Sequence, residues 1–203
     1  MVLDIEVPKI YEPCFYDMNI EECRKNLWYS PRTSWKSSGL GRLIYIYYTT
    51  FKDYDVCVGV DSLSNAGDGV LSEFQAFIES EGLNSDDSWV FASKAIYRRG
   101  SNNQVRAYAV QTNELQNVNT TKGKKLIRPV SLFIMDEVQK LHNEKILLNC
   151  LSTFLRQMKA GHSKVVLAGN PDRRSMWFDT YYKQKLKDPN WTTLKPTYHS
   201  IIE

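Results

Sequence analysis

The sequence predicts an α/β fold in which a mostly parallel central sheet is flanked by helices. Three observations carry this prediction. Residues 131–137 contain an apolar run that ends in two adjacent acids, and a Lys-Ser pair at 36–37 stands between a candidate strand and a candidate helix. A second apolar strand, at 164–167, follows a helix-like stretch at 143–159. Apolar strands that alternate with helices are typical of parallel sheets, which bind ligands at the carboxyl ends of their strands.

Length and composition are consistent with this class. The chain has 203 residues, of which 42% are hydrophobic, enough for one α/β domain with a sizeable core. Its 26 basic and 23 acidic residues give a net charge of +3, so any contact with DNA is expected to be local. The four cysteines show no C-x-x-C spacing, which favours free thiols in a reducing cytoplasm. No stretch is long and apolar enough to predict a membrane span.

Residue periodicity predicts the elements in order. Residues 1–23 are acidic, aromatic and irregular, and predict an arm or short helix; residues 24–203 form the main domain. Within that domain, alternation and helical spacing predict a strand at 26–29, a helix at 37–51, a strand at 55–60, a helix at 68–81, strands at 89–97 and 105–110 joined by a turn at 99–103, a polar loop at 111–130, the strand at 131–137, the helix at 143–159, the strand at 164–167 and a helix at 172–185.

The two acids, Asp136 and Glu137, are placed at the carboxyl end of a buried strand. Successive side chains of a strand point to opposite faces, so the two carboxylates can take different roles. One, Asp136, can hold Mg²⁺, and the other, Glu137, can activate water for attack on a phosphate. The alternative is a strand end that carries two solvated acids.

The stretch Ser30–Ser38 has the context of a phosphate-binding loop, between a strand and a helix. Against the pattern G-x-x-x-x-G-K-[ST], Lys36 and Ser37 stand at the lysine and hydroxyl positions, while Ser30 and Trp35 replace the two glycines. In this interpretation the lysine contacts the β- and γ-phosphates and the serine ligates Mg²⁺. An ordinary helix start is the alternative.

A third polar position follows the strand at 164–167. The sequence there reads Ala168-Gly169-Asn170-Pro171, and the Asn170 side chain could hydrogen-bond the γ-phosphate or the attacking water. A Gly-Asn-Pro turn that leads out of a strand explains the same residues without any ligand.

Together, these motifs resemble the ATPase domain of the large terminase subunit of tailed double-stranded DNA phages. One branch of that family has a loop similar to G-G-R-G-S-G-K-S, and a G-N-P segment followed by an aromatic pair, like Gly169-Asn170-Pro171 and Trp177-Phe178 here. The resemblance covers roughly residues 24–203. In the loop, Ser30, Pro31, Thr33 and Trp35 differ from the family, and four residues match it, namely Arg32, Ser34, Lys36 and Ser37.

The resemblance implies a RecA-like P-loop ATPase that uses ATP and Mg²⁺, with Walker A and Walker B motifs. It implies that Glu137 and Arg32 are catalytic, Arg32 acting in cis on the charge that develops during phosphoryl transfer. It also implies that Ser37 and Asp136 hold the metal. The nucleotide-binding residues that it implies are Ser30, Pro31, Arg32, Thr33, Ser34, Trp35, Lys36, Ser37, Ser38 and Asn170.

The family also implies partners and a place of action. These are double-stranded DNA, a portal protein, a small terminase subunit and a homo-oligomeric ring, expected to be a pentamer, with no membrane involved. The site of action is the host cytoplasm, with transient association with the procapsid. Full large terminases carry a nuclease domain after the motor, and this chain shows no acidic cluster of that kind. We therefore expect translocation by this piece without DNA cleavage.

Several residues keep two interpretations. Trp35 either crowds the phosphates, so that glycine would preserve or tighten binding, or packs against a neighbouring subunit or the base, so that glycine would cost affinity. An aromatic residue of the arm could face adenine, the candidates being Tyr11, Phe15 and Tyr16. Other arginines could reach a neighbour's site (Arg98, Arg99 and Arg106) or DNA (Arg173 and Arg174), although solvated surface charges explain each of them.

Two other functions fit the same motifs. One is a RecA-like DNA-dependent ATPase or helicase. The other is a docking module whose nucleotide site has degenerated, for which Trp35 is the main support.

Overall fold

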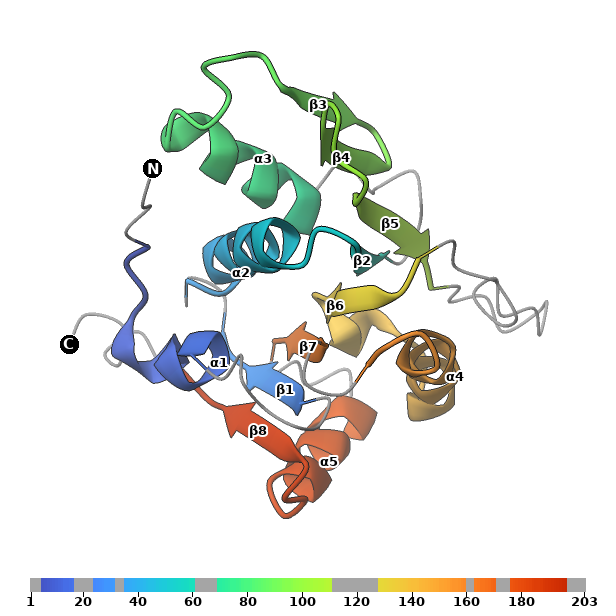
Figure 1. Ribbon diagram of the computed structural model, residues 1–203. Helices are drawn as coiled ribbons and strands as arrows, with labels where there is room; N and C mark the ends of the chain where they lie inside the picture. Colours follow the sequence, from blue (N-terminus) through green and yellow to red (C-terminus); the bar gives the residue numbers. More distant parts are fainter. Residues whose placement is uncertain are drawn as a thin grey trace.

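A computed structural model describes residues 5–16, 24–31, 35–60, 69–110, 128–159, 163–170 and 176–196. Its described strands form one eight-stranded sheet in the order β3-β4-β5-β2-β6-β7-β1-β8 (Figure 1). Five of the strand pairs are parallel: β5 with β2, β2 with β6, β6 with β7, β7 with β1, and β1 with β8. The expected α/β fold with a mostly parallel sheet is therefore confirmed.

The parallel strands comprise β1 (Arg24–Tyr29), β2 (Asp55–Val60), β5 (Val105–Ala109), β6 (Val130–Met135), β7 (Lys164–Gly169) and the edge strand β8 (Trp191–Leu194). Among these strands, β6 and β7 are buried along their whole length, whereas β8 at the edge of the sheet is half-buried. Alternate residues of a strand enter different cores, as strand geometry requires. In β6, Leu132 and Ile134 belong to one core, whereas Phe133 and Met135 belong to the other.

Helices cover the two faces in two groups. One face carries α2 (Lys36–Thr50) and α3 (Val70–Ser80), together with the N-terminal segment formed by η1 (Lys9–Tyr11) and α1 (Glu12–Tyr16). The other face carries η4 (Val138–Lys140), α4 (Glu144–Leu155) and α5 (Met176–Lys185). Figure 1 shows the two groups on either side of the sheet. Among the described residues, no helix is long and apolar enough to cross a membrane.

The N-terminal segment is attached to the sheet through buried polar contacts. The Cys14 thiol donates a hydrogen bond to Asn26 Oδ1 at 3.0 Å and accepts one from Trp28 Nε1 at 3.2 Å. The Cys14 carbonyl accepts a hydrogen bond from Lys164 Nζ, at the start of β7. All four residues are at most 2% exposed. Since buried polar groups are costly to leave unpaired, these contacts fix the segment on β1 and β7.

Several element boundaries differ from the sequence prediction. Residues 89–97 were expected to form one strand, but they form an antiparallel hairpin of β3 (Trp89–Ala92) and β4 (Ala95–Arg98), joined by a two-residue turn. The edge strand β8 was not predicted, because its four residues are half-buried and show no clear alternation. The helix at 143–159 ends earlier, at Leu155, and begins after Asn143, whose side chain accepts a hydrogen bond from Ile146 N.

Candidate functional site

Three neighbouring strands, β6, β7 and β1, end at one edge of the sheet, and a polar residue follows each of them. Asp136 follows β6, Asn170 follows β7, and Ser30 follows β1. The Ser30 N–H donates to the Gly169 carbonyl at 3.0 Å, which extends the pairing of β1 and β7 by one step. Helix α2 begins at the same edge with Lys36. Parallel strand order therefore assembles groups that are far apart in the sequence.

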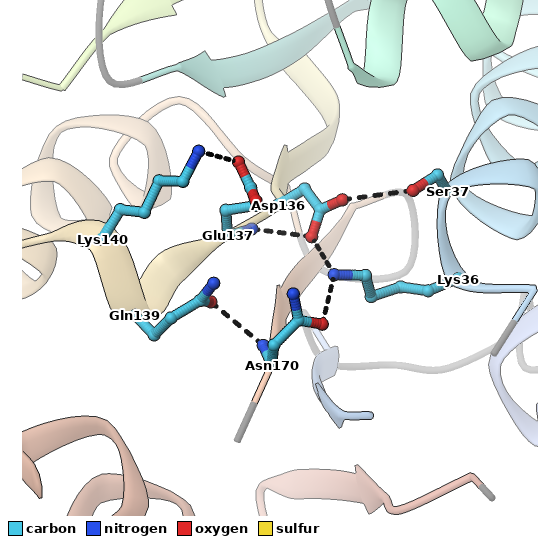
Figure 2. A network of polar contacts seen from close by, with 7 residues as sticks. All are labelled: Lys36, Ser37, Asp136, Glu137, Gln139, Lys140 and Asn170. Carbon is cyan, nitrogen blue, oxygen red and sulfur yellow. Dashed lines mark hydrogen bonds and ion pairs between the residues drawn. The ribbon is translucent and has the colours of Figure 1, made fainter. Parts of the chain in front are cut away.

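Lys36 connects the ends of β6 and β7 in this cluster (Figure 2). Its ammonium group lies 2.6 Å from Asp136 Oδ1 and donates a hydrogen bond to Asn170 Oδ1 at 3.2 Å. The lysine is 7% exposed and the aspartate 14% exposed. A charge this far removed from water needs charged or polar partners, and the ends of β6 and β7 supply both.

The first turn of α2 adds further polar groups. The Ser37 hydroxyl lies 3.5 Å from Asp136 Oδ2, so a hydroxyl and a carboxylate oxygen face each other beside the ammonium. The N–H groups of a first helical turn have no intrahelical acceptor and favour anions. Ser38 differs, because its hydroxyl contacts Glu73 of α3 at 3.4 Å. Any contact of Ser38 with a nucleotide would therefore use its backbone N–H.

Glu137 does not continue strand β6, so the expectation that strand geometry separates the two acids is wrong. The strand ends at Met135, and Glu137 has φ 53° and ψ 36°, in the left-handed region. Its N–H donates to Asp136 Oδ1 at 2.6 Å, and its carboxylate forms an ion pair with Lys140. The two acids do point in different directions, but a tight turn is what separates them (Figure 2).

Gln139 was not singled out by the sequence, yet it belongs to the cluster. Its side-chain oxygen accepts a hydrogen bond from the Asn170 N–H at 3.0 Å. The approach depends on Gly169, where a Cβ would lie 2.9 Å from Gln139 Oε1 and 2.4 Å from the ring of Phe178. Polar contacts thus connect Gln139 to Asn170, Asn170 to Lys36 and Lys36 to Asp136 (Figure 2). The sequence signal that could have pointed to Gln139 is its position three residues after Asp136.

Trp35 is partly buried and packs against aromatic residues of its own chain. Its ring centroid lies 5.4 Å from that of Tyr11 and 6.1 Å from that of Phe15, both in the N-terminal segment. Tyr11 is 0% and Phe15 3% exposed, so neither ring has a face open to adenine, contrary to expectation. The side chain of Tyr16 lies outside the described residues.

The remaining predicted residues divide into two groups. Pro31 is exposed beside Ser30, whereas Arg32, Thr33, Ser34, Arg173 and Arg174 lie outside the described residues. Arg98 pairs with Asp86 at 2.9 Å, and Arg106 donates to Gln104 at 2.8 Å. Because Ile96 pairs with Val105, the first residue of β5, the end of β4 at Arg98–Arg99 lies beyond the amino end of that parallel strand. Arg98 and Arg99 are therefore remote from Lys36 of their own chain.

Known structures share this arrangement of elements. The large terminase of the thermophilic bacteriophage D6E has a TM-score of 0.67 and 13% identity, covering 98% of this chain and 48% of that one. The bacteriophage HK97 large terminase has a TM-score of 0.65 and 12% identity, covering 96% and 39%. The N-terminal domain of the DNA packaging ATPase of bacteriophage phi29 has a TM-score of 0.55 and 14% identity, covering 94% and 96%. The fold is that of a phage terminase ATPase domain.

Structure comparison finds these known terminases, whereas sequence comparison does not. No family model matches the sequence, and no curated protein matches it either. The chain spans about half or less of the D6E and HK97 terminases. Structures of the D6E terminase have been solved with ADP and with ATP-γ-S. The expected resemblance to large terminases, with its RecA-like fold, is thus confirmed.

The residues at the terminase-type sheet edge fit a magnesium nucleotide. A buried ammonium and a helix N-terminus suit phosphates, because both attract negative charge. Mg²⁺ is usually bound by one or two protein oxygens together with phosphate oxygens and water. Ser37 and Asp136 offer such a pair of oxygens 3.5 Å apart, next to the lysine that would contact the phosphates.

Proposed function

We propose that this chain is the ATP-hydrolysing motor domain of a phage large terminase, which drives double-stranded DNA into a procapsid. The observation that carries the proposal is the convergence of Lys36, Ser37, Asp136 and Asn170 at one sheet edge. The terminase ATPase fold supports it independently, as do the D6E terminase structures with ADP and ATP-γ-S.

In this proposal each residue has one task. Lys36 exchanges the Asp136 carboxylate for the β- and γ-phosphates, so that its charge stays paired throughout. Ser37 and Asp136 hold Mg²⁺, which when bound offsets the negative charge of the phosphates. Glu137 accepts a proton from the attacking water, after its carboxylate leaves Lys140. Asn170 orients that water or the γ-phosphate, and Arg32 contributes positive charge from the loop.

The wider assembly belongs to the same proposal. The motor would act as a homo-oligomeric ring, a pentamer, on the portal protein of a procapsid, with a small terminase subunit and the DNA. It would be found in the host cytoplasm. Arg98, Arg99 or Arg106 would then act on a neighbouring copy, because the end of β4 at Arg98 lies beyond the amino end of β5, remote from Lys36 of the same chain.

Three measurements on the purified chain test the proposal. Calorimetric titration with ATP and Mg²⁺ should show binding, and phosphate release should accompany it. Packaging of double-stranded DNA with a portal and procapsid should depend on the same ATP hydrolysis. Absence of ATP binding would instead support the docking module. Hydrolysis stimulated by DNA, without packaging, would support a DNA-dependent ATPase or helicase.

A further inference from the structure

Trp35 has a backbone conformation that bulky residues rarely adopt. It immediately precedes α2 and has φ 59° and ψ 4°, in the left-handed region. This region is disfavoured for residues with a Cβ and is readily adopted by glycine. The phosphate-loop pattern has glycine at this position, before the lysine. The chain therefore keeps a glycine-type turn although the residue is tryptophan, and other contacts must stabilise it.

The contacts of the Trp35 ring are the evident source of that stability. Besides the rings of Tyr11 and Phe15, the guanidinium carbon of Arg42 lies 5.2 Å from the centroid of the indole ring. Tilted aromatic pairs and a cation over an indole face are both favourable. The partly buried ring thus contacts both the N-terminal segment and α2.

Gly39 provides the space that the ring occupies. It lies one helical turn after Trp35, and its N–H donates to the Trp35 carbonyl at 2.8 Å. A Cβ at Gly39 would lie 2.6 Å from Cζ3 and 2.8 Å from Cε3 of the indole. Since these distances are far below van der Waals contact, any side chain at Gly39 would displace the ring.

The surface that Tyr11 and Phe15 present is itself fixed. Tyr11 makes an edge contact with Trp28 of β1, with ring centroids 4.8 Å apart. Between Tyr11 and Phe15 in the sequence, Cys14 is hydrogen-bonded to Asn26, Trp28 and Lys164. A segment held at this many buried points can determine where the Trp35 ring lies.

We infer that Trp35, Tyr11 and Phe15 are positioning residues of the phosphate loop. The N-terminal segment holds the indole, the indole holds the left-handed turn, and the turn places Lys36 and the first N–H groups of α2. The inference rests on the proposed function, because the ligand of this loop is taken to be magnesium ATP. It gives the N-terminal segment a role in nucleotide binding that involves no contact with the base.

Substitution of Trp35 tests whether the indole ring supports nucleotide binding by the phosphate loop. Trp35→Gly suits the backbone but removes the ring, whereas Trp35→Phe retains an aromatic ring. Affinity for ATP-γ-S with Mg²⁺, measured by calorimetry, should fall roughly five- to tenfold in Trp35→Gly, as expected for the loss of one or two aromatic contacts. Trp35→Phe should remain within about twofold of the parent. If Trp35→Gly binds as tightly as the parent or more tightly, the inference is wrong.

Substitution in the N-terminal segment tests whether Tyr11 and Phe15 act on nucleotide binding through Trp35. Tyr11→Leu and Phe15→Leu should each weaken binding, and Tyr11→Leu should add little when Trp35→Gly is already present. Gly39→Ala should also weaken binding in the parent but not in Trp35→Gly. The matched control is Phe91→Leu, which packs against the same core from the far edge strand β3 and should leave affinity unchanged. Additive effects of Tyr11→Leu and Trp35→Gly would contradict the inference.

Hydrogen exchange separates this inference from the proposed function. In Trp35→Gly, the amides of residues 9–15 should exchange faster than in the parent and in Phe91→Leu, with no nucleotide present. Lys36→Ala should weaken nucleotide binding by about 10- to 100-fold without changing that exchange. If the parent binds no ATP-γ-S, the proposed function fails, and the exchange of residues 9–15 still decides whether Trp35 and the segment are coupled. Unchanged exchange in Trp35→Gly would overturn the inference.

Discussion

Lys36 and Asp136 form an ion pair, with 2.6 Å between Nζ and Oδ1, that joins the start of α2 to the end of β6. The two residues come from distant parts of the sequence and meet because β6 and β1 flank β7 in the sheet. The carboxylate compensates a buried ammonium that phosphates can also compensate. In the proposed function, nucleotide binding at this edge would therefore be an exchange of anionic partners.

This exchange makes Lys36 the first residue to test. Lys36→Ala should weaken binding of magnesium ATP by about 10- to 100-fold, since a charged hydrogen bond contributes about 1.5–3 kcal/mol. Binding of DNA should change little. The control is Lys52→Ala, an exposed lysine just beyond the other end of α2. Equal losses for ATP and DNA, measured by titration, would argue against phosphate binding by Lys36.

Glu137 is predicted to act as the base. Glu137→Gln preserves shape but cannot accept the proton, so turnover should fall by about 10²–10⁴-fold while ATP binding is retained. Lys140→Met, which removes the ion-pair partner of Glu137 but leaves the carboxylate, should keep turnover within about threefold. Steady-state phosphate release measures both variants. Parent-like turnover in Glu137→Gln would assign the base elsewhere.

Gln139 is predicted to orient Asn170, because its side-chain oxygen accepts a hydrogen bond from the Asn170 N–H. Gln139→Met removes the acceptor and should lower kcat by about fivefold, the effect of one neutral hydrogen bond, with little change in KM. Gln139→Glu keeps an oxygen at the same place and should restore most of the loss. If both variants raise KM equally and leave kcat unchanged, Gln139 contributes to binding and does not orient Asn170.

Asp55 gives a prediction about stability and pH. Burial raises its pKa above the ordinary value of 3.8, against the opposing hydrogen bond from the Gln104 N–H. The folded protein therefore holds this proton more tightly than the unfolded chain, and the stabilisation from it is present below pH 3.8 and lost as pH rises through the folded-state pKa.

Asp55→Asn should consequently be more stable than the parent at pH 7, because the amide keeps an acceptor for Gln104 without a buried charge. The difference should shrink as pH falls toward the ordinary carboxyl pKa. Urea unfolding of both proteins at pH 7 and at pH 4 measures it. A variant that is less stable than the parent at pH 7 would show that the charge of Asp55 is needed in the folded state.

The parallel sheet and the edge where its polar residues meet could be predicted from the sequence alone. Apolar runs before Asp136 and Asn170 predict buried parallel strands, and the carboxyl ends of such strands lie together. The pattern around Lys36 and Ser37 predicts a strand, a loop and a helix. These signals are local, because a hydrophobic run or a helical spacing can be read from one short stretch of the sequence. The catalytic and metal-binding roles of the residues remain predictions.

Tertiary structure alone decided the rest. The sequence around Glu137 gives no signal for a left-handed turn, yet the residue adopts one after β6 ends at Met135. Gln139 becomes part of the site because Gly169 leaves room beside β7. The Trp35 ring turns toward Tyr11 and Phe15, which are distant in sequence and buried by packing on β1. Sequence patterns report which residues are buried, whereas the partners they meet depend on how the elements pack.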